Sequence, residues 1–231
     1  MSFTTNPLVL FMRSFARRFG VNRLIAPFIY GSGYETRYDN AFQELLIEGD
    51  CVWDVGANIG YYTTLFARKV GESGSVFAFE PSPDNFLRLT TSCAGFKNVR
   101  LLPFGLGQKN AQVSFVQGTD ELGATSHVVD GLASDDTKVD LKSAFSVISE
   151  DLAKKPCAIK IDVEGFEYEV LLGLSNELYN SGLRLIGIEM HFSVLESRGM
   201  KNAPIEIEKL LFNSGFKISW PDSSHLLARR I

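Results

Sequence analysis

The residues best suited to chemistry begin at position 54, where the chain reads DVGANIG. Gly56 and Gly60 would let the backbone turn tightly and let a ligand approach main-chain N–H groups without an intervening side chain. Asp54 opens the segment and supplies a negative charge suited to an ammonium group. A helix starting at this turn would favour a carboxylate or another anion. The segment therefore predicts a loop that binds a ligand with both kinds of charge.

The glycine spacing argues against two common nucleotide-binding loops. A dinucleotide-binding loop has the pattern Gly-x-Gly-x-x-Gly, but Asn58 occupies the position of its second glycine. A phosphate-binding P-loop requires Gly-Lys-Ser/Thr, which the segment lacks. An NAD-linked enzyme is therefore the least favoured of the enzyme classes considered.

Glu80 strengthens the case for the loop because it ends a second apolar run, at residues 75–79. An acid at this place in an open parallel sheet can bind both hydroxyls of a ribose. Alternatively, Glu80 could cap the helix that Pro81 and Pro83 introduce. Together, the glycines, Asp54 and Glu80 fit a sulfonium ligand with a ribose and an amino-acid tail, which is S-adenosylmethionine.

A second group of acids follows the apolar run at residues 158–163. Asp162 and Glu164 lie at its end and would project from the carboxyl edge of the sheet. Burying two close carboxylates is costly unless they share a proton, a cation or a metal. We therefore expect one of them to orient an acceptor hydroxyl or take its proton, although Glu164 could instead cap the next helix. Glu167 and Glu169 are expected on a solvated face.

The three histidines are also candidates for catalysis. His191 follows Glu189 at the end of another apolar run and could be a general base, or a hydrogen-bonded structural residue. His127 is a further candidate base if its loop closes over the site as a lid. His225 is expected to be structural. Asp162, Glu189 and His191 could hold a divalent cation such as Mg²⁺, but no tight ligand motif supports a metal, and we assign none.

Short apolar strands that alternate with helices would position these groups. The expected strands are 51–55, 75–80, 99–104, 158–163 and 183–190. The expected helices are 59–70, one that Pro81 and Pro83 start and that runs through Cys93, 164–178 and 203–213. The segments 216–220 and 225–228 suggest a terminal antiparallel hairpin. The alternation predicts an α/β fold with a doubly wound, mostly parallel sheet, whose ligands bind beyond the carboxyl ends of the strands.

Two regions depart from this alternation. Residues 1–48 are aromatic-rich and predict an N-terminal helical cap, with the four arginines between positions 13 and 23 facing water or a membrane surface. Residues 49–231 then form the main domain. Within it, residues 105–136 contain one candidate strand and a long polar stretch, which predicts a lid-like insertion.

Three motifs in order resemble the FkbM-type family of S-adenosylmethionine-dependent methyltransferases. They are GDCVWDVGANIG at 49–60, FEPSPDNF at 79–86 and KIDVEGFE at 160–167. The resemblance extends over residues 48–116 and 159–189. It weakens in the first forty residues and between Gly118 and Ser149.

This resemblance implies a seven-stranded class I methyltransferase sheet, which is Rossmann-like, and methylation of a hydroxyl oxygen on a sugar, glycan or natural product. It also implies the residues that contact the cofactor. Including neighbours within the same two motifs, the predicted contacts are Asp54, Gly56, Asn58, Gly60, Glu80 and Pro81. The alternatives are an enzyme of the same fold that methylates nitrogen or a protein side chain, and a non-catalytic cofactor-binding module.

Composition limits the partners and the compartment. The 231 residues have a formal net charge of −4, and a sequence pI of about 5.5 argues against general nucleic-acid binding. We find no run of about 20 apolar residues that could span a membrane. Three unpaired cysteines in apolar surroundings favour a reducing, cytoplasmic setting. A small-molecule or glycan acceptor is expected, and homo-oligomer formation is a further hypothesis.

Overall fold

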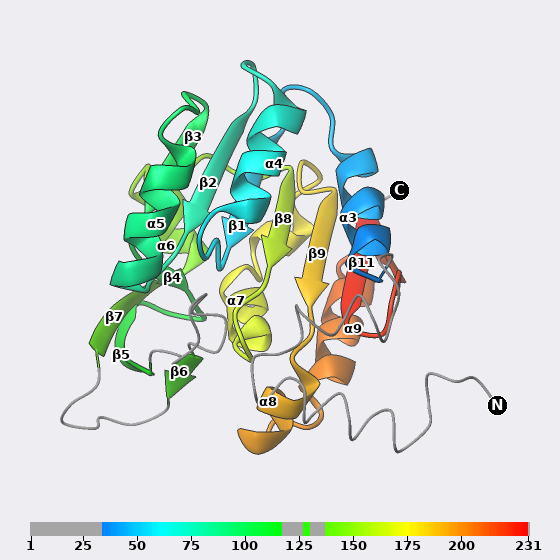
Figure 1. Ribbon diagram of the computed structural model, residues 1–231. Coiled ribbons are helices and arrows are strands. Elements are labelled where there is room, and N and C mark those ends of the chain that lie inside the picture. The colour runs from blue at the N-terminus through cyan, green and yellow to red at the C-terminus, as the bar shows by residue number, and fades with distance from the viewer. Residues whose placement is uncertain (1–33, 117–126, 130–136, 231) are drawn as a thin grey trace.

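The computed structural model describes residues 34–116, 127–129 and 137–230. Their centre is a seven-stranded sheet with helices on both faces (Figure 1). The strand order is β10-β11-β9-β8-β1-β2-β3. The strands are β1 (Cys51–Val55), β2 (Ser75–Phe79), β3 (Val99–Leu102), β8 (Ala158–Ile161), β9 (Leu185–Glu189), β10 (Phe216–Ser219) and β11 (His225–Arg230).

The pairing of the strands confirms the predicted fold class. β1 is central and pairs in parallel with β2 and β8, and β9 continues the parallel set. The chain ends in an antiparallel hairpin, β10–β11, and β11 also pairs antiparallel with β9. All five residues of β1 are buried, as expected for a strand covered on both faces.

Helices cover the sheet in two groups. They are α3 (Tyr34–Leu45), α4 (Tyr61–Val70), α5 (Pro83–Cys93), α6 (Ala144–Ser149), α7 (Glu167–Gly173), α8 (Phe192–Ser197) and α9 (Ala203–Asn213). α3, α4 and α5 lie on one face, and α6, α7 and α9 on the other (Figure 1). Successive β1 residues belong to two different cores, because Val52 lies in the cluster that contains Tyr38 and Phe66, whereas Trp53 lies in the cluster that contains Leu171.

The predicted helix at 164–178 was wrong at both ends. α7 begins at Glu167 and ends at Gly173. The preceding turn places Glu164 at φ 47° and Gly165 at φ 92°, which a right-handed helix does not allow. Glu164 therefore does not cap the helix, since its N-cap residue is Phe166.

A small second sheet occupies the region of the expected insertion. It contains β4 (Gly105–Leu106), β5 (Ala111–Val116), β6 (His127–Val129) and β7 (Thr137–Lys142), in the order β4-β7-β5-β6. β5 is the candidate strand that the sequence suggested, whereas β4, β6 and β7 were not anticipated. Residues 117–126 and 130–136 lie outside the described part, so the lid stays a prediction.

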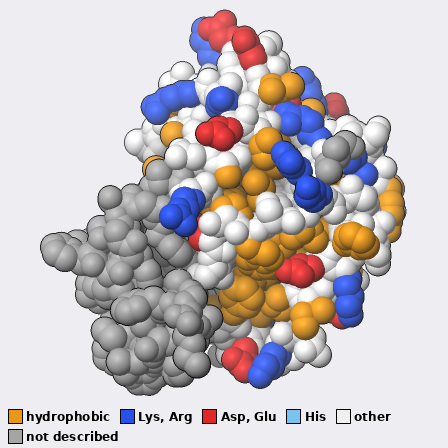
Figure 2. All heavy atoms as spheres, turned by 90° about the vertical axis from the view of Figure 1, so that its right-hand side faces the viewer, with side chains coloured by type: hydrophobic (Ala, Val, Ile, Leu, Met, Phe, Trp, Pro, Cys, Tyr) orange, Lys and Arg blue, Asp and Glu red, His pale blue; other side chains and the backbone are white. Residues whose placement is uncertain are grey.

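The N-terminal cap is described only from residue 34. Within it, α3 buries Tyr38 and Phe42 against the sheet, while the helices and arginines expected before residue 34 lie outside the described residues. The surface on the α3 side carries hydrophobic side chains beside Lys and Arg side chains (Figure 2). Cys51 and Cys93 are buried, Cys157 is half-buried, and all three are free thiols. Within the described ranges, no helix has the length and apolar character needed to cross a membrane.

Candidate active site

The glycine loop joins β1 to α4 and lies against the segment that follows β8. Gly56 and Gly60 have φ of 81° and 93°, a region that glycine enters without steric cost. A Cβ on Gly56 would stand 1.9 Å from the carbonyl oxygen of Asp162, and one on Gly60 would meet Leu89 at 2.8 Å. These glycines therefore serve close packing within the protein, and not only the ligand approach that the sequence suggested.

Glu80 ties the glycine loop to the turn after β2. Its Oε2 accepts the N–H of Asn58 and its Oε1 accepts the N–H of Ser82, both at 2.8 Å. The N-cap of α5 is Ser82, so helix capping does not explain Glu80. Burial raises the pKa of Glu80 to about 7. Each carboxylate oxygen retains a lone pair that could accept a ribose hydroxyl, and the half-buried Pro81 follows it.

Asp54 lies in β1, two residues before Gly56, and is fully buried. Its Oδ2 accepts the hydroxyl of Thr63 at 2.6 Å, and its Oδ1 stands 4.0 Å from Nζ of Lys160. Among the described residues, Oδ1 of Asp54 and the buried Oδ1 of Asn58 have no hydrogen-bond partner. A buried acceptor left unpaired is costly. A ligand with ammonium and hydroxyl donors, such as S-adenosylmethionine, fits these two free acceptors.

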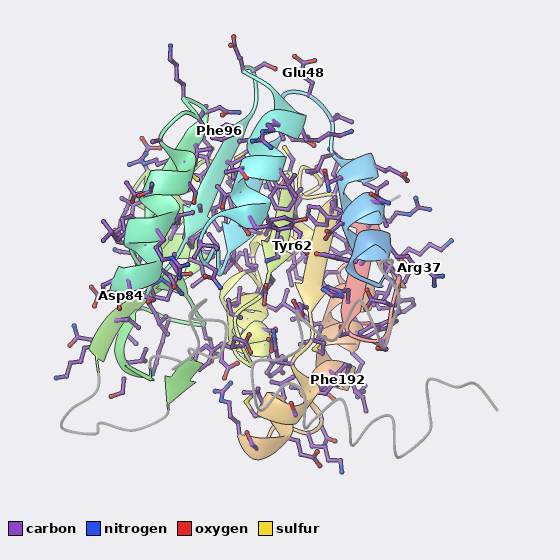
Figure 3. All side chains as sticks on the ribbon, viewed as in Figure 1. Arg37, Glu48, Tyr62, Asp84, Phe96 and Phe192 are labelled. Atoms are coloured by element: carbon purple, nitrogen blue, oxygen red, sulfur yellow. The ribbon has the colours of Figure 1, made fainter. Side chains whose placement is uncertain are left out.

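Lys160 links the loop to the second acidic group. Its ammonium binds Oδ2 of Asp162 at 2.9 Å and lies 4.1 Å from the ring centre of Tyr62, on α4. Tyr62 lies near the ends of β1 and β8 (Figure 3), and its hydroxyl donates to Asp39 of α3 at 2.6 Å. The sequence reasoning gave Lys160 no role. A single lysine within the apolar run AIKI was the available signal.

His191 brings the remaining acids together. Its Nε2 stands 3.2 Å from Oε2 of Glu164, 3.8 Å from Oδ1 of Asp162 and 4.0 Å from Oε1 of Glu189. Its Nδ1 lies 2.6 Å from Oε1 of Glu167. Asp162, Glu164 and His191 each offer one ligand atom within 4.8 Å of the others, a spacing that could hold a metal ion. The structure thus unites three of the four predicted catalytic residues.

The prediction that Glu167 faces solvent was wrong. Glu167 is fully buried, and its Oε1 also accepts the N–H of Gly165 at 2.8 Å. A buried acid on Nδ1 of an imidazole fixes the direction in which Nε2 points. Glu167 is therefore the main site residue that the sequence reasoning missed. Glu169, also expected in solvent, pairs instead with Arg198.

Glu164 and His191, at the centre of this cluster, have shifted pKa values. Burial raises the pKa of Glu164, an effect that the charge of His191 only partly offsets. Burial alone would lower the pKa of His191, but its contacts with Glu164 and Glu167 raise that pKa well above its ordinary value. The contacts of His191 thus favour its protonated form, and Glu164 is the acid whose proton affinity is increased.

The other two histidines lie in different surroundings. His127 belongs to β6, where its backbone pairs with Val116. Its side chain lies outside the described part, so its catalytic role stays a prediction. His225 is buried, and its Nδ1 binds Oδ2 of Asp222 at 2.9 Å while its Nε2 faces Oε2 of Glu189 at 3.5 Å. Through Glu189, His225 is therefore connected to the acids around His191.

The chain matches known proteins in sequence. The family model of the methyltransferase FkbM domain matches residues 54–218. Hexuronic acid methyltransferase AglP of Haloferax volcanii is 34% identical over 150 residues, which cover 64% of this chain and 58% of that protein. Methyltransferase 1 of Beauveria bassiana is 28% identical over 145 residues, covering 54% and 58%. The match thus spans less than two thirds of each relative.

Solved structures share the fold. The methyltransferase FkbM from Methylobacillus flagellatus aligns with a TM-score of 0.55 at 15% identity, over 87% of this chain and 46% of that one. A Streptococcus mutans protein solved in complex with SAH gives a TM-score of 0.53 at 11% identity, over 85% and 97%. These likenesses identify the fold as that of class I methyltransferases. With the motif loop, Glu80 and the acids after β8 in place and the family model matching most of the chain, the protein belongs to the FkbM methyltransferase family.

Proposed function

We propose that this protein transfers a methyl group from S-adenosylmethionine to a hydroxyl oxygen of a sugar acid. The observation that carries the proposal is the cluster of Asp162, Glu164 and His191 at the same sheet edge as the free acceptors of Asp54 and Asn58. The acceptor class follows from the relative that is named a hexuronic acid methyltransferase.

The cofactor would lie across the glycine loop. Asp54 would accept its ammonium group, Glu80 its ribose hydroxyls, and the side chain of Asn58 a further donor. Bound there, S-adenosylmethionine supplies an electrophilic methyl group on a positively charged sulfur. The buried Asp54 and Glu80 are held by Thr63 and by backbone N–H groups, so little reorganisation would accompany binding.

Glu164 is proposed to receive the proton of the acceptor hydroxyl when the hydroxyl oxygen would bond to the methyl carbon and the methyl–sulfur bond would break, leaving a neutral thioether. Its raised pKa suits a base, because an acid with greater proton affinity accepts a proton more readily near neutral pH. Asp162, held by Lys160, would orient the hydroxyl. His191, aligned by Glu167, would hold the carboxylate of Glu164 in place. Alignment and exclusion of water would supply the rest of the catalysis.

We propose that the reaction needs no metal ion. The ammonium of Lys160 already binds one oxygen of Asp162, and the imidazolium of His191 faces the remaining acids. These two cations supply positive charge where a divalent ion would stand. Methyl transfer is therefore expected to continue unchanged in EDTA.

The test combines an acceptor screen with one variant. The protein is incubated with S-adenosylmethionine and a panel of hexuronic acid glycosides, neutral sugars and peptides, and a 14-Da gain is sought by mass spectrometry.

Glu164→Gln should lower kcat by about 10²- to 10⁴-fold with unchanged cofactor affinity, whereas Glu196→Gln, an exposed acid on α8, should behave as wild type. A gain on peptides alone would reject the sugar assignment. Loss of the rate in EDTA would reject the metal-free reaction.

A further inference from the structure

Glu189 has an unusual position at the edge of the candidate site. It is the last residue of β9, and β11 lies beside it with His225 as its register partner. Its Oε2 stands 3.5 Å from Nε2 of His225, and its Oε1 stands 4.0 Å from Nε2 of His191. The side chain keeps 31% of its surface exposed, so the carboxylate lies between two imidazoles and still reaches solvent.

Asp222, in the turn between β10 and β11, holds His225 in place. Its Nδ1 binds Asp222, whose Oδ1 also accepts the N–H groups of Ser224 and His225, each at 2.9 Å. Its ring stacks on Tyr38 of α3, with 4.3 Å between ring centres. Because Asp222 binds Nδ1 of His225, the ring orientation is fixed and Nε2 faces Glu189.

The order acid, histidine, acid in Asp222–His225–Glu189 also occurs around His191. There, Glu167 holds Nδ1 of His191, and Nε2 of that imidazole faces Glu164 and Glu189. Glu189 is thus the one described acid that both imidazoles approach with Nε2 within 4.0 Å. The methyl-transfer step as proposed above gives no role to Asp222, His225 or Glu189.

We propose that Asp222 and His225 are positioning residues that hold the Glu189 carboxylate in place as a binding site for a second hydroxyl of the acceptor. Glu164 and Glu189 both approach Nε2 of His191, so they can accept hydroxyls on adjacent carbons. The acceptor class is therefore a ring with neighbouring hydroxyls. The acceptor part of this proposal rests on the proposed function, whereas the positioning part does not.

The charged surroundings support an ionised Glu189. Lys160 of β8, His191 after β9 and His225 of β11 approach it, opposed by Glu164, and Tyr38 of α3 faces it without charge. Although burial would raise the pKa of Glu189, its hydrogen bond to His225 and the two imidazolium charges lower that pKa below its ordinary value.

The positioning part can be tested without an acceptor. The chain has only three histidines, so ¹⁵N NMR of labelled imidazoles in the full-length protein follows each of them against pH. Glu189→Gln should lower the titration midpoint of His225 by at least one pH unit and also lower that of His191. Asp222→Asn, which keeps the turn's acceptor oxygen, should lower that of His225 alone by a similar amount. Glu196→Gln serves as the control and should change neither.

Unchanged midpoints in Glu189→Gln would overturn the positioning proposal. His225→Phe provides a second check because it preserves the ring that packs on Tyr38 and removes both polar contacts. If packing alone mattered, His191 would titrate in His225→Phe as in wild type. We expect instead a measurable shift in its midpoint, since Glu189 loses one of its two partners and turns toward the other.

The acceptor part uses whichever sugar gains a methyl group in the screen above. Removing the neighbouring hydroxyl of that sugar should lower kcat/KM by about 10- to 100-fold in wild type, mainly through KM, and have little effect in Glu189→Gln. An equal loss in both proteins would overturn the acceptor assignment. If no sugar is methylated, the proposed function fails, and the imidazole titrations still decide the positioning of Glu189.

Discussion

At the scale of single residues, the site consists of charges that are buried only because each has a partner. Lys160 is 2% exposed and stands between Asp54 and Asp162, and Glu167 is fully buried against His191. Removing one partner of such a pair leaves an uncompensated charge, which costs far more than a surface pair is worth. From the sequence alone, Lys160 has no assigned role and Glu167 is expected in solvent, because neither prediction takes the partner of the charge into account.

Glu80 leads to a prediction about the pH dependence of cofactor binding. Burial raises its pKa to about 7, and ribose hydroxyls donate to the ionised carboxylate. The affinity for S-adenosylmethionine should therefore weaken as the pH falls below about 7, by up to about tenfold per pH unit. Calorimetric titrations between pH 8 and pH 5.5 measure this slope. Glu80→Gln should bind weakly at every pH, while Glu72→Gln, an exposed acid, should keep the wild-type slope. If the affinity of Glu80→Gln still fell steeply with decreasing pH, the proton that weakens binding would belong to a group other than Glu80.

At the scale of elements, two loops that are far apart in the sequence pack backbone to backbone. The loop after β1 places Gly56 against the carbonyl of Asp162, in the loop after β8. The same two strands pair in parallel, so their ends meet at one edge. This contact brings the glycine loop close to the acid cluster. The turn before α7 separately adopts left-handed angles at Glu164 and Gly165, so the helix begins only after these acids.

Gly56→Ala tests that contact through stability. Alanine would need a φ of 81° and would place its Cβ 1.9 Å from a carbonyl oxygen that cannot move independently. We expect the free energy of unfolding to fall by about 3 kcal/mol or more, measured by urea denaturation. The matched control is Gly95→Ala, because no atom lies within 4 Å of its Cβ position and its φ is not positive. Equal stability of the two variants would show that the loops separate easily.

At the scale of the whole molecule, the C-terminal hairpin and α3 complete a site that the parallel strands begin. β11 inserts between β9 and β10 and brings His225 to Glu189. α3 contributes Tyr38 to the stack on His225 and Asp39 to the hydroxyl of Tyr62. A Cβ at Gly187 of β9 would stand 2.1 Å from the Tyr38 hydroxyl, so α3 can approach the sheet only over a glycine.

His225 should make global stability depend on alkaline pH. Burial lowers its pKa, but Asp222 and Glu189 outweigh this and raise the pKa to about 9. A pKa raised above the unfolded value of about 6.5 contributes stability that is complete below about pH 6.5 and is lost as the pH rises through about 9. The contribution is about 3 kcal/mol. Unfolding free energies of wild type and His225→Gln should therefore differ most at pH 6 and converge by pH 10. A difference that is constant with pH would show that His225 only packs.

The sequence alone predicted the strands and the longer helices of the main sheet, the glycine loop, the acid at the end of β2 and the terminal hairpin, but not the second sheet, α6 or α8. Apolar periodicity and turn residues are local signals, and the ends of parallel strands share one edge. Only the tertiary structure decided which charges are buried and with which partners. Glu167 meets His191 across 24 residues, and His225 meets Glu189 through the register of β11 on β9. Whether a charge is solvated or paired depends on contacts from distant segments, and no local pattern encodes them.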